Sequence, residues 1–226
     1  MKTKFIYIVP ILLLFFTFVC LCTVKASFEY EELPKETAEE VFQNIGITKF
    51  DNPNYTGKFN SFGASENGNY SIGYKEWSRG YVLIFDKDGV YISGFAFDIN
   101  GDFYIELSDD FLTIYTVRGA HAIEIDYDGK MISVKSIPNT TENNSYWNKL
   151  QANKKSSVGE YAYSTGGIFT EYSKLTRTDE NGNQSVLYEA GALGKIAVTL
   201  PLVALIVFPI AITLTAVIII RKVKHS

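Results

Sequence analysis

The feature that most constrains this chain is a pattern that occurs three times: an apolar run, then Asp-x-(Asp/Asn)-Gly, then a second apolar run. The copies read "IFDKDGVYISGF" (84–95), "IEIDYDGKMISV" (123–134) and "TRTDENGNQSVL" (176–187). β-Branched and aromatic residues on both sides of an Asp-Gly or Asn-Gly pair predict a β-hairpin, with both central turn residues at positive φ. Three such hairpins commit this part of the chain to antiparallel β-sheet.

The spacing of the copies defines a repeat. The first two turns are 40 residues apart, and the third follows 53 residues later, after the polar stretch "NTTENNSYWNKLQ". We therefore predict two hairpin repeats over residues 74–137, a polar insert over 138–156 and a partial third repeat over 157–190. Within the repeats, "DFYIEL" alternates apolar and polar positions, which is typical of a strand with one buried side and one solvent-facing side.

The stretch before the repeats is predicted to contain one helix and then loops. Residues 34–45 are expected to form a short helix, because Pro34 suits a first turn and Gly46 suits a helix end. Its apolar residues fall on one face, which is expected to pack against the rest of the domain. Residues 49–73 are rich in Asn, Gly and Ser, and are expected to be loops with at most short strands.

Units of about forty residues with a strand, turn and strand resemble the blades of β-propeller repeat families. The resemblance covers residues 74–188 and implies a mostly β fold, an antiparallel meander of propeller-like hairpin repeats. A closed propeller needs about four blades or more, and two good copies and a partial one are present. The full layout is also similar to membrane-anchored proteins of Gram-positive bacteria that have no assigned activity.

Both ends of the chain carry long uncharged segments. Residues 1–26 are predicted to be a signal peptide or an N-terminal membrane anchor, and small residues near the end of this segment favour cleavage after Ala26. Residues 196–220 are long enough for a transmembrane helix, and the basic tail 221–226 follows at once. Because basic residues flank both segments, residues 27–192 are expected outside the cell and the C-terminus in the cytoplasm. The predicted location is the cell membrane, with one pass, or two if the first segment is not cleaved.

The predicted outer part is acidic and contains no cysteine. Residues 27–192 hold all 25 acidic residues but only 14 of the 21 basic ones, a net charge of −11. Such a surface argues against binding nucleic acid. The lack of cysteine means that this part folds without disulfides, which favours a bacterium with a single membrane. The expected partners are therefore the lipid bilayer and a protein of the cell envelope.

One copy of the repeated turn has the carboxylates for a cation. Glu124, Asp126 and Asp128 occupy the first three ligand positions of a calcium loop of the EF-hand type, but the twelfth position is Lys135 instead of Glu. The other two copies lack the twelfth-position Glu too, and they also have no carboxylate at the first ligand position. A hairpin turn explains all three copies, whereas calcium explains at most one, so we predict no metal site and leave calcium at these three residues as a question for experiment.

The sequence also lacks the usual catalytic motifs. The outer part has one histidine, His121, on a strand where a satisfied sheet residue is the expected role. Asp109–Asp110 or Glu106 could supply carboxylates for glycoside hydrolysis, provided that two carboxyl groups stand about 5 to 9 Å apart in a substrate-sized cleft. Because adjacent Asp residues between strands are ordinary turn formers, we predict no catalytic residue, no cofactor and no enzymatic activity.

The two tryptophans are candidates for a binding platform. Trp77 and Trp147 would recognise sugar or peptide if exposed, and would belong to the core if buried. Trp147 is the stronger candidate from sequence, because it is expected in a polar loop with little to pack against.

These observations predict a membrane-anchored extracytoplasmic interaction or accessory module without catalytic activity. The alternative is an extracytoplasmic carbohydrate-binding or ligand-binding sensor domain, and after that a glycan-active enzyme.

Overall fold

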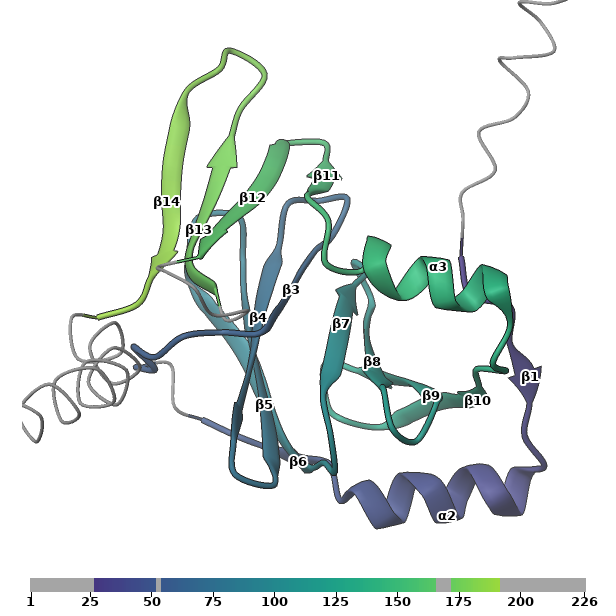
Figure 1. Cartoon of the computed structure of the whole chain (residues 1–226). Helices are drawn as coiled ribbons and strands as arrows, with labels where there is room; N and C mark the ends of the chain where they lie inside the picture. The colour runs from purple at the N-terminus through teal and green to yellow at the C-terminus, as the bar shows by residue number, and fades with distance from the viewer. Residues whose placement is uncertain (1–26, 52–53, 166–171, 192–226) are drawn as a thin grey trace, which may run out of the picture.

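The computed structural model describes residues 27–51, 54–165 and 172–191 (Figure 1). The predicted segments 1–26, 196–220 and 221–226 lie outside them. In the described part of the chain, no helix has both the length and the apolar character needed to cross a bilayer.

The described chain is mostly β, as predicted, and its strands form three antiparallel sheets. The first sheet has the order β2-β6-β5-β4-β3. Its strands are β2 (Thr48–Lys49), β3 (Ser61–Ala64), β4 (Tyr70–Glu76), β5 (Arg79–Phe85) and β6 (Tyr91–Asp98). Four consecutive strands, β3 to β6, thus form a meander, and the short β2 extends it.

The other two sheets repeat this plan. In the second sheet, β1 (Glu31–Glu32) joins the outer edge of a meander that consists of β7 (Phe103–Leu107), β8 (Phe111–Thr116), β9 (His121–Asp126) and β10 (Met131–Ser136). The third sheet consists of β11 (Lys154–Ser156), β12 (Gly159–Thr165), β13 (Tyr172–Thr178) and β14 (Gln184–Glu189). Each repeat therefore contributes four strands, and the repeated turn joins the third strand of a meander to the fourth.

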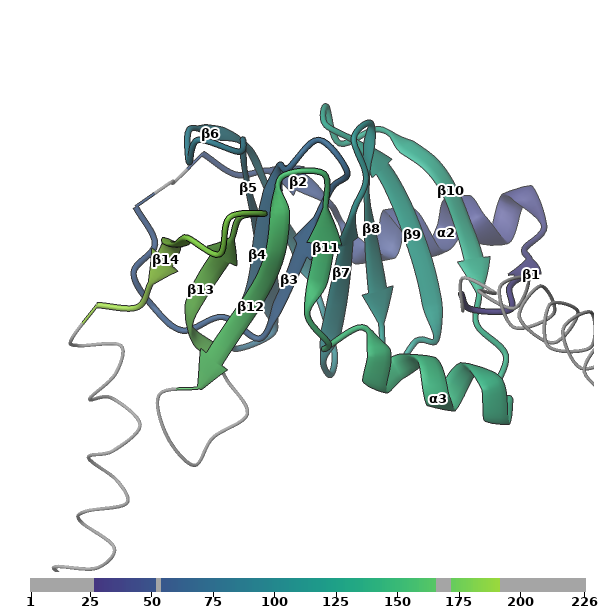
Figure 2. The same ribbon diagram turned by 90° about the horizontal axis from the view of Figure 1, so that it is seen from above.

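The first sheet lies between the other two and shares a core with each (Figure 2). One core includes Phe95 and Phe97 from β6 and Phe103 from β7, all fully buried. The other includes Phe62 from β3 and Tyr161 from β12. The first strands of the meanders approach one another, since β3 contacts both β7 and β11.

Residues 49–73 were predicted to be loops with at most short strands. The four-residue β3 fits that prediction, whereas β4, which begins at Tyr70 and has seven residues, is longer than expected. The first meander also begins before residue 74. These strands contain glycine because the first two sheets pack closely. A Cβ atom on Gly63 would lie 2.8 Å from the backbone nitrogen of Leu107, and one on Gly73 would lie 3.0 Å from the Phe103 ring. Glycine lowers β-propensity, but it allows the two sheets to approach.

The predicted N-terminal helix is confirmed as α2 (Lys35–Ile45), which covers the core at the lower edge in Figure 1. Ala38 and Ile45 are buried, and two partly buried neighbours pack on the same core. Gly46 ends the helix in the left-handed conformation, with φ of 59°.

The polar insert contains a second helix, α3 (Thr141–Lys149), and is not the loop that was expected around Trp147. The Thr140 side chain caps it by accepting a hydrogen bond from the Asn143 backbone N–H at 3.1 Å. Asn143 is buried, and its side chain bonds to both the N–H and the C=O of Glu29. The helix is thereby fixed to the N-terminal segment across the face of the second sheet (Figure 1).

Candidate functional site

The three Asp-x-(Asp/Asn)-Gly sequences form the same hairpin turn. In each, a side-chain oxygen of the first Asp accepts hydrogen bonds from the backbone N–H groups two and four residues later, at 2.9 and 2.8 Å. Only the glycine has positive φ, at 87° for Gly89 and 83° for both Gly129 and Gly182. The prediction that both central residues would have positive φ is therefore wrong. The turn is a three-residue loop that ends in a left-handed glycine, and the Asp side chain satisfies its amides.

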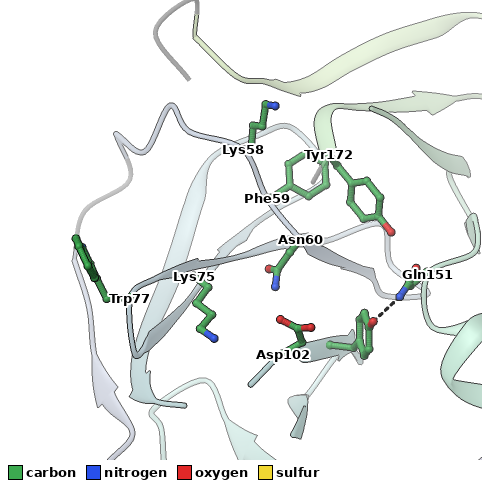
Figure 3. A pocket seen from close by; sticks show the side chains of 9 residues that line it. Lys58, Phe59, Asn60, Lys75, Trp77, Asp102, Gln151 and Tyr172 are labelled. Carbon is green, nitrogen blue, oxygen red and sulfur yellow. Dashed lines mark hydrogen bonds between the residues drawn. The ribbon is translucent and has the colours of Figure 1, made fainter. Parts of the chain in front are cut away.

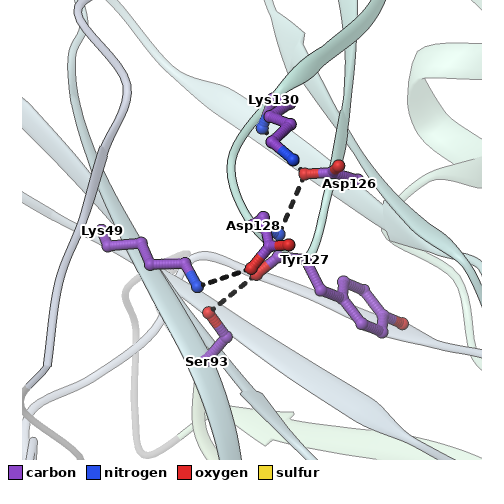
Figure 4. A network of polar contacts seen from close by, with 6 residues as sticks. All are labelled: Lys49, Ser93, Asp126, Tyr127, Asp128 and Lys130. Carbon is purple, nitrogen blue, oxygen red and sulfur yellow. Dashed lines mark hydrogen bonds and ion pairs between the residues drawn. The ribbon is translucent and has the colours of Figure 1, made fainter.

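The three carboxylates weighed as calcium ligands all contact protein groups. Asp126 accepts the two backbone hydrogen bonds of its own turn. Asp128 forms an ion pair with the Lys49 ammonium at 3.0 Å (Figure 4). Glu124 accepts a hydrogen bond from the Ser133 hydroxyl at 2.6 Å. The hydrogen bond and charge of Lys49 lower the pKa of Asp128.

This turn also joins two sheets, since Ser93 of β6 donates a hydrogen bond to the Tyr127 carbonyl at 3.4 Å. Within the residues that the structure describes, no group of three or more His, Cys, Asp or Glu side chains is arranged to hold a metal ion.

His121 lies at the start of β9 and is partly buried. Its backbone N–H donates a hydrogen bond to the Thr116 side-chain oxygen at 3.2 Å. Burial lowers the pKa of the imidazole. His121 is therefore placed as a sheet residue whose backbone helps to hold the turn between β8 and β9.

The structure brings the candidate glycosidase carboxylates to one cavity of about 630 Å³, here called the acidic pocket. Its lining includes Glu66, Glu106, Asp109, Asp110, Tyr146, Lys154 and Lys155. Asp109 accepts a hydrogen bond from the backbone N–H of Asn67 at 3.0 Å. Glu106 lies near the end of β7, and Asp109 and Asp110 follow in the turn to β8.

Glu106 has a structural role in this pocket. One of its oxygens accepts from the Tyr115 hydroxyl and the other from the Tyr146 hydroxyl at 2.9 Å. These bonds tie α3 to the second sheet. Burial, with the charge of Glu106, raises the pKa of both tyrosines. Burial also lowers the pKa of the Lys154 ammonium, although the nearby Glu106 opposes that shift.

A second cavity, of about 380 Å³, combines aromatic and polar side chains and is here called the aromatic pocket (Figure 3). It is lined by Lys58, Phe59, Asn60, Lys75, Trp77, Asp102, Tyr104, Gln151 and Tyr172. These residues come from the segment before β3, the end of β4 and the loop after it, the start of β7 and the residue before it, the segment after α3, and the start of β13. All three sheets therefore contribute to it or border it.

Trp77 stands at the rim of the aromatic pocket and is 97% exposed. It begins the two-residue loop between Glu76 and Arg79, which pair as the last residues of β4 and β5. Its φ is 56°, a value that side chains other than glycine adopt at a cost. The loop holds the indole away from every core of the described chain.

The polar groups of the aromatic pocket are held at defined positions. Lys75 donates a hydrogen bond to the Gly101 carbonyl at 2.6 Å, and Gln151 donates one to the Tyr104 hydroxyl. The side-chain oxygen of Asn60 is buried and has no hydrogen-bond partner among the described residues. Figure 3 shows Asn60, Lys75 and Asp102 turned toward the same space.

Trp147 does not form the exposed platform that the sequence predicted. It lies on α3, is partly buried, and packs edge-on against Phe28 at a centroid distance of 4.6 Å. Tyr104 and Tyr115 are further aromatic neighbours, at 5.9 and 6.3 Å. The exposed tryptophan is Trp77, whose position between two strand-like runs was the available sequence signal. Asn60, Asp102 and Gln151 were missed, because nothing in the sequence links such distant residues.

Neither a scan against protein-family models nor a search of curated proteins finds a match to this chain. The functional argument therefore rests on the geometry of the two pockets. Of the two, the aromatic pocket has the feature that the fold explains least, an exposed indole on a left-handed backbone.

Proposed function

We propose that this protein is a membrane-anchored extracytoplasmic module that recognises another component of the cell envelope without catalysis. The recognition surface is the end of the molecule that carries Trp77 and the aromatic pocket. The membrane anchor and the orientation rest on the sequence, through residues 196–220 and the basic tail. The observation that carries the proposal is the near-complete exposure of Trp77.

Folding alone does not account for Trp77. At 97% exposure the indole gains almost nothing from burial, and its backbone at φ 56° costs about 1–2 kcal/mol for a residue with a side chain. Both features favour a smaller residue or glycine at this position. Tryptophan is, however, enriched among the residues that dominate binding energies, because its large face is desolvated by the partner. A recognition role accounts for both costs.

A non-catalytic role is supported by the way the carboxylates are used. Both oxygens of Glu106 accept hydrogen bonds from tyrosine hydroxyls, and Asp109 accepts from a backbone amide. The first Asp of each repeated turn satisfies two amides of its own hairpin. These contacts give Glu106, Asp109 and the turn aspartates a role in stabilising the native structure.

The sheet plan supports a propeller-like interpretation of the scaffold. Each sheet contains a meander of four consecutive strands, with the same turn between its third and fourth strand, and β3 contacts both β7 and β11. Propeller blades are meanders of this kind with their first strands near a common axis. Loops at one end of such an axis form a natural recognition surface, and the aromatic pocket is assembled from such loops and strand ends.

Site-specific photo-crosslinking tests the proposal in the full-length protein in its native membrane. A photoreactive phenylalanine derivative replaces Trp77 in one variant and Val186 in another, since Val186 is 51% exposed on β14 and is a matched control. We expect a discrete adduct from position 77 only, with the captured component identified by mass spectrometry. Absence of an adduct at position 77, or the same adducts at both positions, would overturn the proposal.

A further inference from the structure

The aromatic pocket has the composition of a site for one class of ligand. Its volume of about 380 Å³ is within the range of roughly 300–1,000 Å³ typical of small-molecule sites. Four of its nine lining residues are aromatic, and the other five carry amide or charged groups. A fitting ligand therefore has apolar faces and several hydrogen-bonding groups on one small framework.

Trp77 supplies the apolar surface. Its indole is exposed at the rim, so a ligand can cover the ring without displacing any part of the protein. The face of an aromatic ring carries partial negative charge, which attracts weakly positive C–H groups. Pyranose rings present such C–H groups on one face and hydroxyls around the edge.

The polar groups match the edge of such a ring. The Asp102 carboxylate accepts hydrogen bonds, the Lys75 ammonium donates them, and the Asn60 amide does both. Lys75 is already positioned by the Gly101 carbonyl, which fixes its ammonium for further donation. The Asn60 oxygen has no partner among the described residues, so rotation of this amide can offer an acceptor to a hydroxyl.

Other ligand classes fit less well. Lys58 and Lys75 could pair with one anionic group, but a polyanion would also meet the Asp102 carboxylate and the acidic surface of the surrounding domain. A purely apolar ligand would bury the charges of Asp102 and Lys75 without replacing their contacts with water. A saccharide satisfies both the aromatic surface and the mixed donors and acceptors.

We infer that the aromatic pocket binds a saccharide, with one pyranose ring stacked on Trp77 at the rim and the hydroxyls of a neighbouring sugar unit bonded to Asp102, Lys75 and Asn60. This inference rests on the proposed recognition function and names its ligand class. The ligand is a neutral glycan of the cell envelope, and the same chemistry accommodates a free oligosaccharide.

The test is isothermal titration calorimetry of the full-length protein in lipid nanodiscs that are prepared without glycosidic detergent. The probes are chitohexaose, cellohexaose and maltohexaose at concentrations up to millimolar. We expect at least one of them to bind with a saturable heat signal. Trp77→Ala is expected to weaken that binding by about tenfold or more, while Trp77→Tyr keeps part of it and Trp147→Phe keeps all of it.

Asp102→Asn is a second variant that preserves shape and removes the charge, and we expect several-fold weaker binding. If none of the three probes binds, or if binding survives Trp77→Ala unchanged, the saccharide inference is wrong. The crosslinking experiment separates this failure from failure of the recognition function, because a protein adduct at position 77 without saccharide binding would retain the function and change its ligand class.

Discussion

The two tryptophans of this protein lie in regions with opposite surroundings. Trp147 is on α3, where Phe28 lies 4.6 Å away between ring centroids and two tyrosines complete an aromatic cluster. Trp77 is on the β4–β5 loop and is 97% exposed. The difference teaches that the role of an aromatic residue is decided by whether a distant segment covers it, since the covering residue Phe28 is far from Trp147 in sequence.

The covered region is held by an extended set of contacts. Phe28 is 3% exposed and also packs against Tyr115 and Tyr146, while Asn143 fixes the next residue, Glu29, through two hydrogen bonds. Around Trp77, the polar contacts position neighbours such as Lys75 and leave the indole exposed. Substitutions in the first region are therefore expected to change stability, and substitutions in the second to change binding.

The largest expected effect is from Phe28→Ala. Removal of this buried ring should lower the free energy of unfolding by about 3–5 kcal/mol, because a cavity forms between the second sheet and α3. Chemical denaturation of the full-length protein in nanodiscs measures the change. Trp77→Ala is the matched control, and an equal loss for the two variants would contradict the contrast.

The next effect is from Asn143→Ala. The buried Asn143 side chain bonds to both backbone groups of Glu29 and to the Pro138 carbonyl, so its removal leaves these groups unpaired. We expect a loss of about 1–3 kcal/mol by the same denaturation measurement. The exposed neighbour Asn144 is the control, and Asn144→Ala should change stability by no more than about 0.5 kcal/mol.

Alkaline pH should weaken the covered region, together with the other parts of the fold that bury tyrosines. Burial, together with the charge of Glu106, raises the pKa of Tyr115 and Tyr146, so the unfolded chain ionises first, near pH 10. Stability should be constant below that pH and should fall as pH rises through the range between the unfolded and the folded pKa.

Denaturation midpoints measured on either side of pH 10 check this dependence. Tyr146→Phe should make the alkaline loss shallower, because it removes one of the buried hydroxyls whose pKa is raised, and Trp77→Phe should leave the slope unchanged. A slope that is identical in wild type and Tyr146→Phe would show that this hydroxyl is not shielded.

The smallest expected effect on stability is from Trp77→Gly. Relief of the backbone at φ 56° should leave the free energy of unfolding unchanged or raise it by up to about 1 kcal/mol, since glycine tolerates this conformation but gains entropy in the unfolded chain. Saccharide titration should show loss of binding in the same variant. A clear loss of stability would mean that the indole packs against the protein.

The sequence predicted the elements whose signals are local. The repeated hairpins depend on an Asp side chain and a glycine within five residues, and α2 depends on a single apolar face ended by Gly46. The start of the first meander before residue 74 was not predicted, because Gly63 and Gly73 have low β-propensity and are required by close contacts with Leu107 and Phe103 of another sheet. Helix α3 was missed because its stability depends on Phe28 and Asn143 contacts that no local pattern reveals.

The candidate site also depends on contacts between segments that are distant in the sequence. Sequence reasoning weighed both tryptophans and favoured Trp147, because its polar neighbours suggested a loop with nothing beneath it. Asn60, Lys75 and Asp102 meet only when two sheets are in place. Exposure of Trp77 likewise depends on the absence of a covering segment in the described fold, which a local pattern cannot predict.

The most direct test of the contrast is acrylamide quenching of two single-tryptophan variants of the full-length protein in nanodiscs. The chain has two tryptophans, so Trp147→Phe reports only Trp77 and Trp77→Phe reports only Trp147. Trp77 should be quenched steeply and Trp147 several-fold less. Equal quenching, or stronger quenching of Trp147, would contradict the assignment of one tryptophan to the surface and the other to the aromatic cluster.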